Sequence, residues 1–500
     1  MGAKDSAWIE DAIPVTRSAR SADSEDVRYD SPVTKQLEKR LLRKIDYTVL
    51  PLMGISMLIS FLDRGNIGNA RVLGMQKDTG LSNQQFLNII MMFFLGYVLL
   101  ELPACLSLRY VHARFAFGVP IMAFGIFVIL MAFCTSYAAL MVLRVLVGLG
   151  EVFVNNAFIF LTLWYKPEEV ALRIAIMYTS TTIAGATSGL ISYACGVTLE
   201  GHDGLYDWQW MFIIEGVMAV GIGVIVMIFL PGTPDEVAKK GSLFIKKEEE
   251  RQLIAARYHA SHNTAGEVFR ASQLLVGIQD PKMWLGALTV GSGGVGLGAF
   301  SVFLPTLIHA FGFDPLRTQL FVMVPYAFAL VGMIASALIS KRIGQRAPVV
   351  LACLGTTILG FIILISVTGQ VASMVGACFV ITGAYSGVVL SVSFVLTLHG
   401  GYTKRSLAVW LMQIVINVYS VAATQVYRTP PRFYLGHGLA LGLYCLGFGC
   451  ATTIWVICKR ENAQKLRRRE DFAAKGEVDP DMEKSYEELC DRHPGFLYAL

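Results

Sequence analysis

The sequence predicts an all-α membrane protein in which twelve transmembrane helices form two six-helix bundles. Hydrophobic residues make up 54% of the 500 residues and charged residues only 16%, whereas soluble domains are about one quarter charged. A transmembrane helix needs about 20 predominantly apolar residues. Runs of this kind occur six times, stop for a polar stretch, and then occur six times more. We therefore expect a polytopic membrane protein and not a soluble enzyme.

The apolar runs divide the chain into two halves joined by a polar loop. The predicted spans lie near 46–64, 86–108, 115–133, 137–163, 173–198 and 209–230, and then near 284–305, 319–340, 347–368, 372–398, 405–427 and 434–458. We interpret the polar stretch as an exposed connection with an amphipathic helix, because charge runs such as 246–251 occur in it. The predicted parts are an N-terminal tail (1–44), a first bundle (45–230), a central loop (231–280), a second bundle (281–458) and a C-terminal tail (459–500).

The basic residues predict the orientation in the membrane. They gather before the first span, in every second loop and after the last span, which is typical of segments that stay in the cytoplasm. Examples are Lys35, Lys39, Arg40, Arg43, Lys44, Arg109, Arg114, Lys166, Arg173, Lys341, Arg342, Arg346, Lys404, Arg405, Lys459 and Arg460. We therefore expect both termini and the central loop to be cytoplasmic. The net charge of +5 then concerns membrane orientation, and we expect no nucleic-acid partner.

The sequence carries no motif for ATP-driven or hydrolytic chemistry. The dipeptide Gly-Lys of a phosphate-binding loop does not occur, and neither does H-E-x-x-H or G-x-S-x-G. The nine cysteines form no C-x-x-C pair, so we interpret them as small apolar packing residues. The glycine-rich segment 291–298 lies inside a span, where glycines let helices approach closely or bend. We expect no enzyme activity, no cofactor and no metal site.

Charged residues inside the spans are distributed unequally between the halves. Each costs about 2.5–3.5 kcal/mol at the bilayer centre, so each needs a reason. The second half, 281–458, holds a single acidic residue, Asp314, in a loop. If protons drive transport, the carboxylates that carry them must therefore lie in the first half. The charged residues within or at the edges of the first six spans are Asp63, Arg64, Glu101, Arg144, Glu151 and Glu215.

Two interpretations of these charges remain open from the residues alone. Asp63 and Arg64 lie towards the outer end of the first span, and Arg144 and Glu151 lie two helical turns apart on one face of the fourth. One interpretation is an anion anchor, Arg64, beside titratable Asp63 and Glu151. The other is structural ion pairing that holds helices together. For Glu101, as for Glu215, a structural role is favoured.

Several motifs closely resemble those of one transporter family. The segment Phe61-Leu-Asp-Arg-Gly-Asn-Ile-Gly-Asn-Ala70 resembles the first-helix signature of the anion:cation symporter family of the major facilitator superfamily, in its fungal allantoate permease-like branch. The similarity extends along nearly the whole membrane region. Further matching motifs are Tyr97-x-x-x-Glu101-Leu-Pro103, Arg144-x-x-x-Gly148-x-x-Glu151, Trp208-x-Trp210-x-Phe212-Ile-Ile-Glu215-Gly216, Gly401-Tyr-Thr-Lys-Arg405, Asn417 and Pro431-Arg-Phe-Tyr434.

The resemblance implies roles for six residues. In the wider family the first-helix arginine holds a substrate carboxylate, and this role falls on Arg64. The protonatable groups are the preceding aspartate and a fourth-helix glutamate, which correspond to Asp63 and Glu151. Three further residues match a fourth-helix arginine that partners these acids, a second-helix tyrosine that faces the cavity and an eleventh-helix asparagine near the substrate, namely Arg144, Tyr97 and Asn417.

This sequence departs from the family pattern at two places. The fourth span continues as Val152-Phe-Val-Asn-Asn156 where the family usually has Ala-Gly and a proline, and His399 stands where an asparagine is common. Because both places could border the cavity, we expect an atypical substrate. The fifth span lacks the Gly-Pro of the drug:proton antiporters, which weighs against export by exchange.

From the residues and the resemblance together, we expect a twelve-helix major facilitator that imports a small organic anion together with a proton by alternating access. The resemblance implies a carboxylate substrate such as allantoate, nicotinate, pantothenate or biotin. We expect a monomer in the lipid bilayer of the plasma membrane. Two alternatives remain, namely efflux of a secondary metabolite and a nutrient receptor that does not transport.

Overall fold

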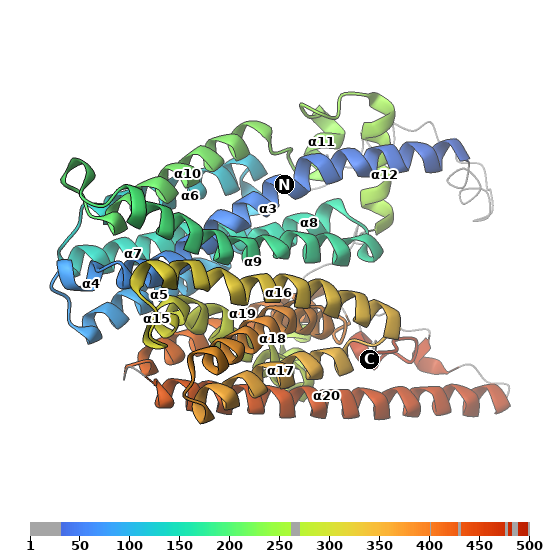
Figure 1. The fold of residues 1–500 in the computed structure, drawn as a ribbon. Helices are drawn as coiled ribbons and strands as arrows, with labels where there is room; N and C mark the ends of the chain where they lie inside the picture. The colour runs from blue at the N-terminus through green and yellow to red at the C-terminus, as the bar shows by residue number, and fades with distance from the viewer. Residues whose placement is uncertain are drawn as a thin grey trace.

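The computed structural model describes residues 32–261, 271–400, 402–428, 432–475, 479–482 and 489–498. These residues form helices and loops only, and twelve of the helices are long and apolar enough to span a membrane. The first six spans form one bundle and the last six form a second bundle beside it (Figure 1). The predicted fold class is therefore confirmed. Most of the predicted tail at 1–44 and the motif residues Gly401 and Pro431 lie outside the described residues.

The spans of the first bundle match the first six apolar runs. They are α3 (Pro32–Val72), α5 (Asn83–Tyr110), α6 (Ala113–Ala132), α7 (Tyr137–Glu151) with η1 (Val152–Asn155) and α8 (Asn156–Trp164), α9 (Pro167–Thr198) and α10 (Asp207–Phe229). The short elements α4 (Met75–Asp78) and η2 (His202–Gly204) occupy two of the loops.

The spans of the second bundle follow the central loop, whose described residues, 231–261 and 271–280, form three helices. The loop helices are α11 (Pro234–Lys240), α12 (Glu248–Ser261) and α13 (Ala271–Gln279). The spans are α14 (Pro281–Gly294) with η3 (Val295–Phe300) and α15 (Ser301–Ala310), α16 (Pro315–Ile343), α17 (Ala347–Ser366), α18 (Gln370–Leu396), α19 (Tyr402–Val426) and α20 (Tyr434–Lys475). The described part of the C-terminal tail contains the short 3₁₀ helices η4 (Pro480–Met482) and η5 (Cys490–Arg492).

The helix ends follow from local sequence. Ser82 accepts a hydrogen bond from the backbone N–H of Gln85, and the Gln85 side chain accepts one from the Ser82 N–H, so this capping box starts α5. Asp314 caps α16, with a proline at the first helical position, and Gly344 ends that helix in the left-handed region at φ 72°. These signals fix where the chain turns between spans.

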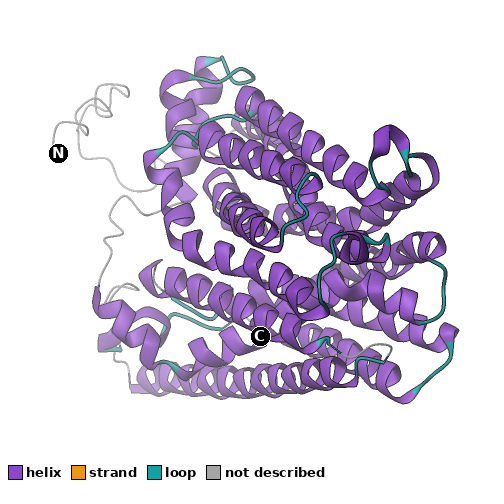
Figure 2. Ribbon diagram, turned by 90° about the vertical axis from the view of Figure 1, so that its left-hand side faces the viewer, coloured by secondary structure: helices purple, strands orange, loops and turns teal. Residues whose placement is uncertain are grey.

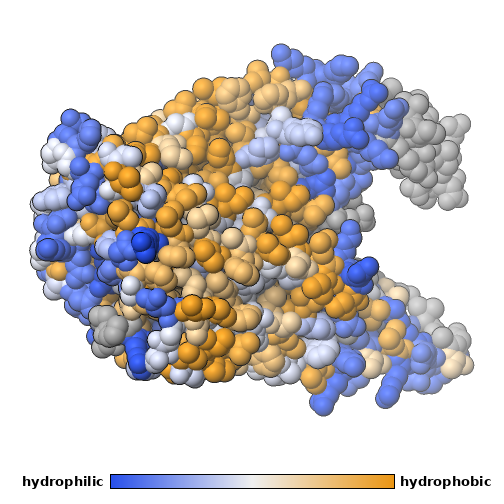
Figure 3. Space-filling model, viewed as in Figure 1, coloured by the Kyte–Doolittle hydropathy of each residue, from blue (hydrophilic) through white to orange (hydrophobic). Residues whose placement is uncertain are grey.

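The two ends of the molecule differ in the helices and loops that lie there. We call the end with the first turns of α3, the helices α11 and α12 and the last turns of α20 the tail end (Figure 1). Both α3 and α20 extend well beyond the predicted spans at this end, since α3 begins at Pro32 and α20 ends at Lys475. Figure 3 shows a hydrophobic belt around the middle of the molecule and hydrophilic residues at both ends. This distribution is the one that a lipid bilayer requires.

The glycine-rich segment of the seventh span packs directly against the eleventh. A Cβ atom on Gly294 would lie 2.3 Å from the carbonyl oxygen of Ile416, and one on Gly298 would lie 2.2 Å from the Ser420 hydroxyl. The chain forms a π-helical segment, η3, over 295–300. The prediction that these glycines permit close approach of helices is therefore confirmed.

The central loop is attached to both bundles. Its helix α12 forms ion pairs with the first bundle, from Glu250 to Lys44 at 2.5 Å and from Arg257 to Glu169 at 2.6 Å. At the other end of the loop, Asp280 accepts a hydrogen bond from Lys404 at 2.6 Å.

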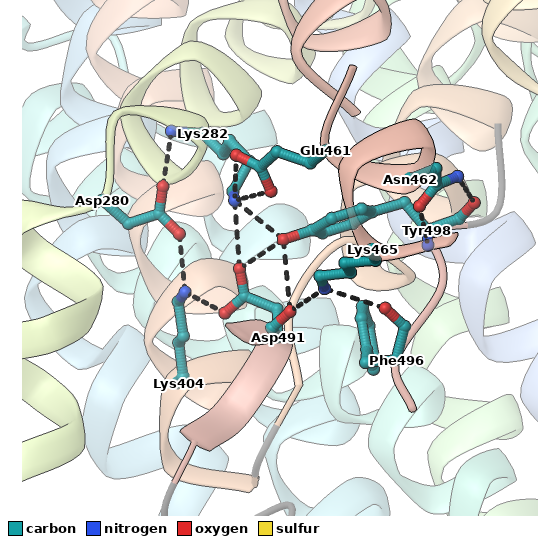
Figure 4. Close-up of polar contacts among 9 residues, drawn as sticks. All are labelled: Asp280, Lys282, Lys404, Glu461, Asn462, Lys465, Asp491, Phe496 and Tyr498. Atoms are coloured by element: carbon teal, nitrogen blue, oxygen red, sulfur yellow. Dashed lines mark hydrogen bonds and ion pairs between the residues drawn. The ribbon is translucent and has the colours of Figure 1, made fainter. Parts of the chain in front are cut away.

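The C-terminal tail folds back onto the second bundle through a buried carboxylate (Figure 4). Asp491 receives a hydrogen bond from Lys404 at the start of α19 and lies 3.1 Å from the ammonium of Lys282 at the start of α14. The Tyr498 hydroxyl donates to the same carboxylate at 2.9 Å. Burial alone would raise the pKa of Asp491, but the two ammonium groups outweigh burial and hold this pKa well below its usual range.

The extension of α20 supplies the other half of this contact. The Asn462 amide bonds both the backbone N–H and the carbonyl of Tyr498, at 2.9 and 3.0 Å. Lys465 donates to the carbonyl oxygens of Asp491 and Phe496. Residues 489–498 are thus pinned to α14, α19 and α20 at once, and we call this contact the tail clasp.

The two bundles touch at one end and separate at the other. At the end opposite the tail end, the Asn83 side chain donates to the carbonyl of Arg428 at 3.0 Å, and Gln84 donates to Gln425 at 2.9 Å. The backbone of α3 is also in contact with α15 there, where a Cβ on Gly68 would lie 1.9 Å from the carbonyl oxygen of Val302. At the tail end, the outline in Figure 3 is hollowed between the bundles.

Candidate functional site

Arg64 and Glu151 form a tight ion pair between the first and fourth spans. The guanidinium Nε donates to Glu151 Oε1 at 2.5 Å, and the Ser60 hydroxyl donates to the same oxygen at 2.6 Å. The Glu151 side chain is fully buried, whereas 15% of the Arg64 side chain remains exposed. Arg64 is therefore the member of the pair that a ligand can reach.

A second ion pair lies beside the first and is buried on both sides. Arg144 Nη1 donates to Asp63 Oδ2 at 3.1 Å, and the two side chains are 2% and 3% exposed. Asp63 and Arg64 point to different partners because consecutive residues on a helix do not face each other. The structure thus joins Asp63 with Arg144 and Arg64 with Glu151.

Several buried polar atoms of these residues have no hydrogen-bond partner. They are Asp63 Oδ1, Glu151 Oε2 and the Nε and Nη2 atoms of Arg144. Unsatisfied buried polar atoms are costly, so each needs an explanation such as an unseen water, a proton or a ligand. Each carboxylate therefore keeps one oxygen on which a proton can be bound.

Aromatic rings surround the guanidinium of Arg64. Its central carbon lies 4.5 Å from the ring centroid of Phe61, 5.4 Å from that of Phe93 and 5.1 Å from that of Tyr97. The predicted residue Tyr97 therefore lies beside Arg64 in the structure. Aromatic faces attract a cation and exclude water, which strengthens its attraction for an anion.

The sixth predicted residue, Asn417, lies on the other bundle and bonds to Glu101. Its amide donates to Glu101 Oε2 at 3.2 Å, and the Gln413 amide donates to Oε1 at 3.2 Å. Asn417 is 5% exposed. No described contact joins it to Arg64, so its predicted role near the substrate stays a prediction.

The residues at the two departures from the family pattern have structural partners. The Asn156 amide donates to the carbonyl of Ala104 on α5 at 2.7 Å and is buried. His399 is fully buried next to the tail clasp, where burial and the charge of Lys404 lower its pKa to about 4. Neither contact involves the Arg64 region.

Three residues near this region were not singled out from the sequence. Ser60 bonds Glu151, and Tyr326 and Tyr385 of the second bundle stack edge to face with ring centroids 5.7 Å apart. Gly185 of α9 lies against the Tyr326 ring, which brings this pair to the bundle interface. The sequence signal that could have identified these three residues is a hydroxyl-bearing side chain within an apolar span. Within the described residues, no group of three or more His, Cys, Asp or Glu side chains is arranged to hold a metal ion.

Comparison with known proteins agrees with this architecture. The chain is 28% identical over 494 residues to the high-affinity nicotinic acid transporter of Saccharomyces cerevisiae, covering 97% of this chain and 89% of the relative. It is 30% identical over 440 residues to the MFS-type transporter cnsO of Penicillium expansum, covering 85% of each. Among solved structures, the inward-open xylose transporter XylE from E. coli superposes with a TM-score of 0.64 at 12% identity, over 81% of this chain and 95% of that chain.

A sequence profile of the Major Facilitator Superfamily matches residues 53–424. This match covers most of both bundles, including Asp63, Arg64, Arg144 and Glu151. The twelve spans, the two-bundle fold and the named relatives agree with it. The chain therefore belongs to the Major Facilitator Superfamily and is a multi-pass membrane transporter.

Proposed function

We propose that this transporter imports a small organic carboxylate together with protons. The observation that carries the proposal is the asymmetry of the two ion pairs. Arg64 keeps 15% of its side chain exposed, whereas Asp63, Arg144 and Glu151 are at most 3% exposed. The arrangement supplies one accessible cation and two sequestered carboxylates.

Arg64 suits a carboxylate substrate for chemical reasons. A guanidinium holds a carboxylate through two parallel hydrogen bonds and stays charged at any physiological pH. In the structure only its Nε contacts Glu151. The planar group can therefore bind a ligand through its remaining donors. The similarity to a nicotinic acid transporter supports a small aromatic carboxylate such as nicotinate as the first candidate.

Glu151 and Asp63 suit proton coupling because each is paired with an arginine inside the first bundle. A substrate anion bound at Arg64 competes with Glu151 for the guanidinium. When Glu151 loses this partner, its negative charge is left buried, and protonation relieves the cost. Substrate binding and proton binding then favour each other, which is the requirement for symport.

The proposal also assigns each end of the molecule to one side of the membrane. The tail end carries exposed basic residues such as Arg114, Lys341 and Arg342, and such residues favour the cytoplasmic side. We assign both termini and the central loop to the cytoplasm and the protein to the plasma membrane as a monomer. The hollow at the tail end then opens to the cytoplasm.

Uptake by a host that lacks its own carboxylate carriers tests the proposal. The host, expressing this chain, is supplied with labelled nicotinate, allantoate, pantothenate and biotin at several external pH values. We expect accumulation of one of these acids that weakens as the external pH rises and collapses when a protonophore is added. Accumulation that ignores both treatments contradicts proton coupling.

The Glu151→Gln variant separates coupling from binding. It removes the titratable group and keeps a side chain of similar size, so we expect loss of concentrative uptake with substrate binding largely retained. Equal loss of both contradicts the role of Glu151. Binding without any flux in the wild type identifies a receptor, and flux only out of preloaded vesicles identifies an efflux carrier.

A further inference from the structure

Among the described acidic residues inside the spans, Glu101 differs from the others in where its hydrogen-bond partners lie. Asp63 bonds Arg144, Glu151 bonds Arg64 and Ser60, and Glu215 bonds Asn66, so the described partners of each of these acids lie within the first bundle. Glu101 instead bonds two residues of α19 in the second bundle. It is the described acid of the spans whose hydrogen bonds cross the interface between the bundles.

The partners of Glu101 are neutral amides. Gln413 and Asn417 each donate at 3.2 Å, one to each carboxylate oxygen. Glu101 is 4% exposed, and the described residues contribute no ion pair to it. Tyr97 lies one turn away on the same helix, and Arg64 of α3 is the cation whose field reaches Glu101.

The place of this contact along the interface matters for alternating access. The other described hydrogen bonds of α5 with α19 and with the residues just after α19 lie near the opposite end, at Asn83, Gln84, Gln425 and Arg428. Glu101 lies about 25 Å further along α5 than Gln84, at about 1.5 Å per residue, and therefore towards the tail end where the bundles separate (Figure 3). Its two bonds are the described α5–α19 hydrogen bonds nearest the hollow.

A proton bound inside one bundle can change the arrangement of the two bundles only through contacts that cross between them. We propose that Glu101 is the positioning residue that links protonation to the movement of the second bundle. When Glu101 is ionised, it accepts two charge-assisted hydrogen bonds that hold α5 against α19 in the arrangement seen here. Protonation removes the charge and weakens both bonds, because charge-assisted hydrogen bonds are roughly twice as strong as neutral ones. The arrangement with an open tail end then loses stability relative to the one in which the tail end closes.

This inference deepens the proposed function and rests on the assumption that protons act on this carrier. It concerns a residue that does not bind the substrate carboxylate in the proposal. Its test therefore needs neither the substrate nor a measurement of flux.

The test measures the distance between the bundles at the tail end as a function of pH. The full-length protein in lipid nanodiscs carries two fluorophores, introduced through unnatural amino acids at the exposed positions Arg114 and Lys341. We expect the ratio of open to closed tail ends in the wild type to fall about tenfold between about pH 8 and about pH 5.5, the range in which a buried glutamate gains its proton. A wild-type ratio that does not change with pH overturns the proposal.

Two variants assign the response to Glu101. Glu101→Gln keeps the shape and removes the titratable charge, so we expect the closed, acid-like ratio at every pH. The pair Gln413→Ala with Asn417→Ala leaves the carboxylate and removes its partners, and we expect the same closed ratio without a pH response. This second variant keeps the test decisive if Glu101→Gln does not fold. A wild-type pH response in either variant overturns the proposal.

Gln84→Ala is the matched control, because it removes a neutral hydrogen bond between the same two helices. We expect this variant to shift the ratio by a similar amount at all pH values and to keep the pH response. Loss of the pH response in Gln84→Ala would show that any weakening of the α5–α19 contact is sufficient and would overturn the specific role of Glu101. Uptake that ignores a protonophore, combined with a Glu101-dependent pH response of the bundles, would contradict the proposed symport and leave this link intact.

Discussion

Arg64 illustrates how one side chain serves a structural contact and a proposed binding role. Its Nε is engaged by Glu151 at 2.5 Å, three aromatic rings pack around the group, and part of it stays exposed. Arg144, by contrast, is only 2% exposed and lies out of reach of a ligand in this arrangement. The accessible donors of Arg64 are the feature that distinguishes the anchor interpretation from structural ion pairing.

Substitutions at Arg64 test these two interpretations. We expect Arg64→Lys to weaken substrate binding about a hundredfold, because lysine keeps the charge and loses the donor fork. We expect Arg64→Ala to abolish transport, since it also leaves Glu151 buried without its cation, at a cost of about 3–5 kcal/mol. Equilibrium binding and uptake with the acid found in the uptake screen provide the measurements.

The double variant Arg64→Gln with Glu151→Gln separates the interpretations further. The structure pairs Arg64 with Glu151 and not with its neighbour Asp63, so this double change leaves no lone charge in that pair. If Arg64 has only a structural role, binding returns in the double variant. The anchor role predicts a protein that folds and reaches the membrane and still does not bind the anion.

At the scale of elements, the tail clasp joins the C-terminal tail to three helices of the second bundle. Asp491 is the centre of this contact, between Lys282 and Lys404, and Asn462 and Lys465 hold the backbone that follows (Figure 4). Lys404 also bonds Asp280, where the central loop enters the second bundle. The clasp therefore connects the tail, the loop and the ends of α14, α19 and α20.

We expect Asp491→Asn to destabilise this contact strongly, by about 3–5 kcal/mol, because Lys282 and Lys404 would remain buried without their shared anion. The low pKa of Asp491 means that the ionised form contributes its stability above the unfolded-state pKa of about 3.9 and loses it only below that value. Limited proteolysis of the tail should therefore be slow and unchanged between about pH 8 and about pH 5 in the wild type, and fast in Asp491→Asn.

The exposed acid Asp471 on the last turns of α20 provides the control for the clasp. Asp471→Asn changes the same charge on the same tail and touches no part of the clasp, so proteolysis should stay slow. Equal cleavage rates in Asp491→Asn and the wild type would contradict the stabilising role of Asp491.

At the scale of the whole molecule, the structure is closed at one end and hollowed at the tail end (Figure 3). Bonds from Asn83 and Gln84 to the second bundle close the end opposite the tails. Our assignment of the tail end to the cytoplasm makes this arrangement an inward-open one. The same structure would be outward-open if the tail end faced the outside, so the orientation of the chain in the membrane needs a direct test.

Epitope tags test this orientation. We expect tags at residue 1 and at residue 500 to bind antibody only after the cells are permeabilised, because the flanking basic residues favour the cytoplasmic side. A tag inserted after Gly201, in the exposed turn that contains η2, should be accessible on intact cells. Antibody binding to either terminal tag on intact cells would contradict the assignment.

The amino-acid sequence alone was sufficient for the architecture. Apolar runs separated by polar turns specify transmembrane helices because a backbone in lipid must satisfy its own hydrogen bonds, and all twelve predicted runs became spans. The close packing around the 291–298 glycines also followed from composition, since only a residue without a side chain permits such contact. The motifs around Asp63 and Glu151 identified the charged residues that lie together in the first bundle.

The pairing of these residues was decided by the tertiary structure. Asp63 and Arg64 are neighbours in sequence, yet their side chains leave the helix in different directions and meet Arg144 and Glu151 on another helix. The contact of Glu101 with Asn417 spans 316 positions, and the tail clasp joins Lys282 to residues near the C-terminus. Local sequence fixes which helices form, because span length and capping act within a few turns. Which charge meets which is set by the rotation and packing of whole helices, and no local pattern encodes that.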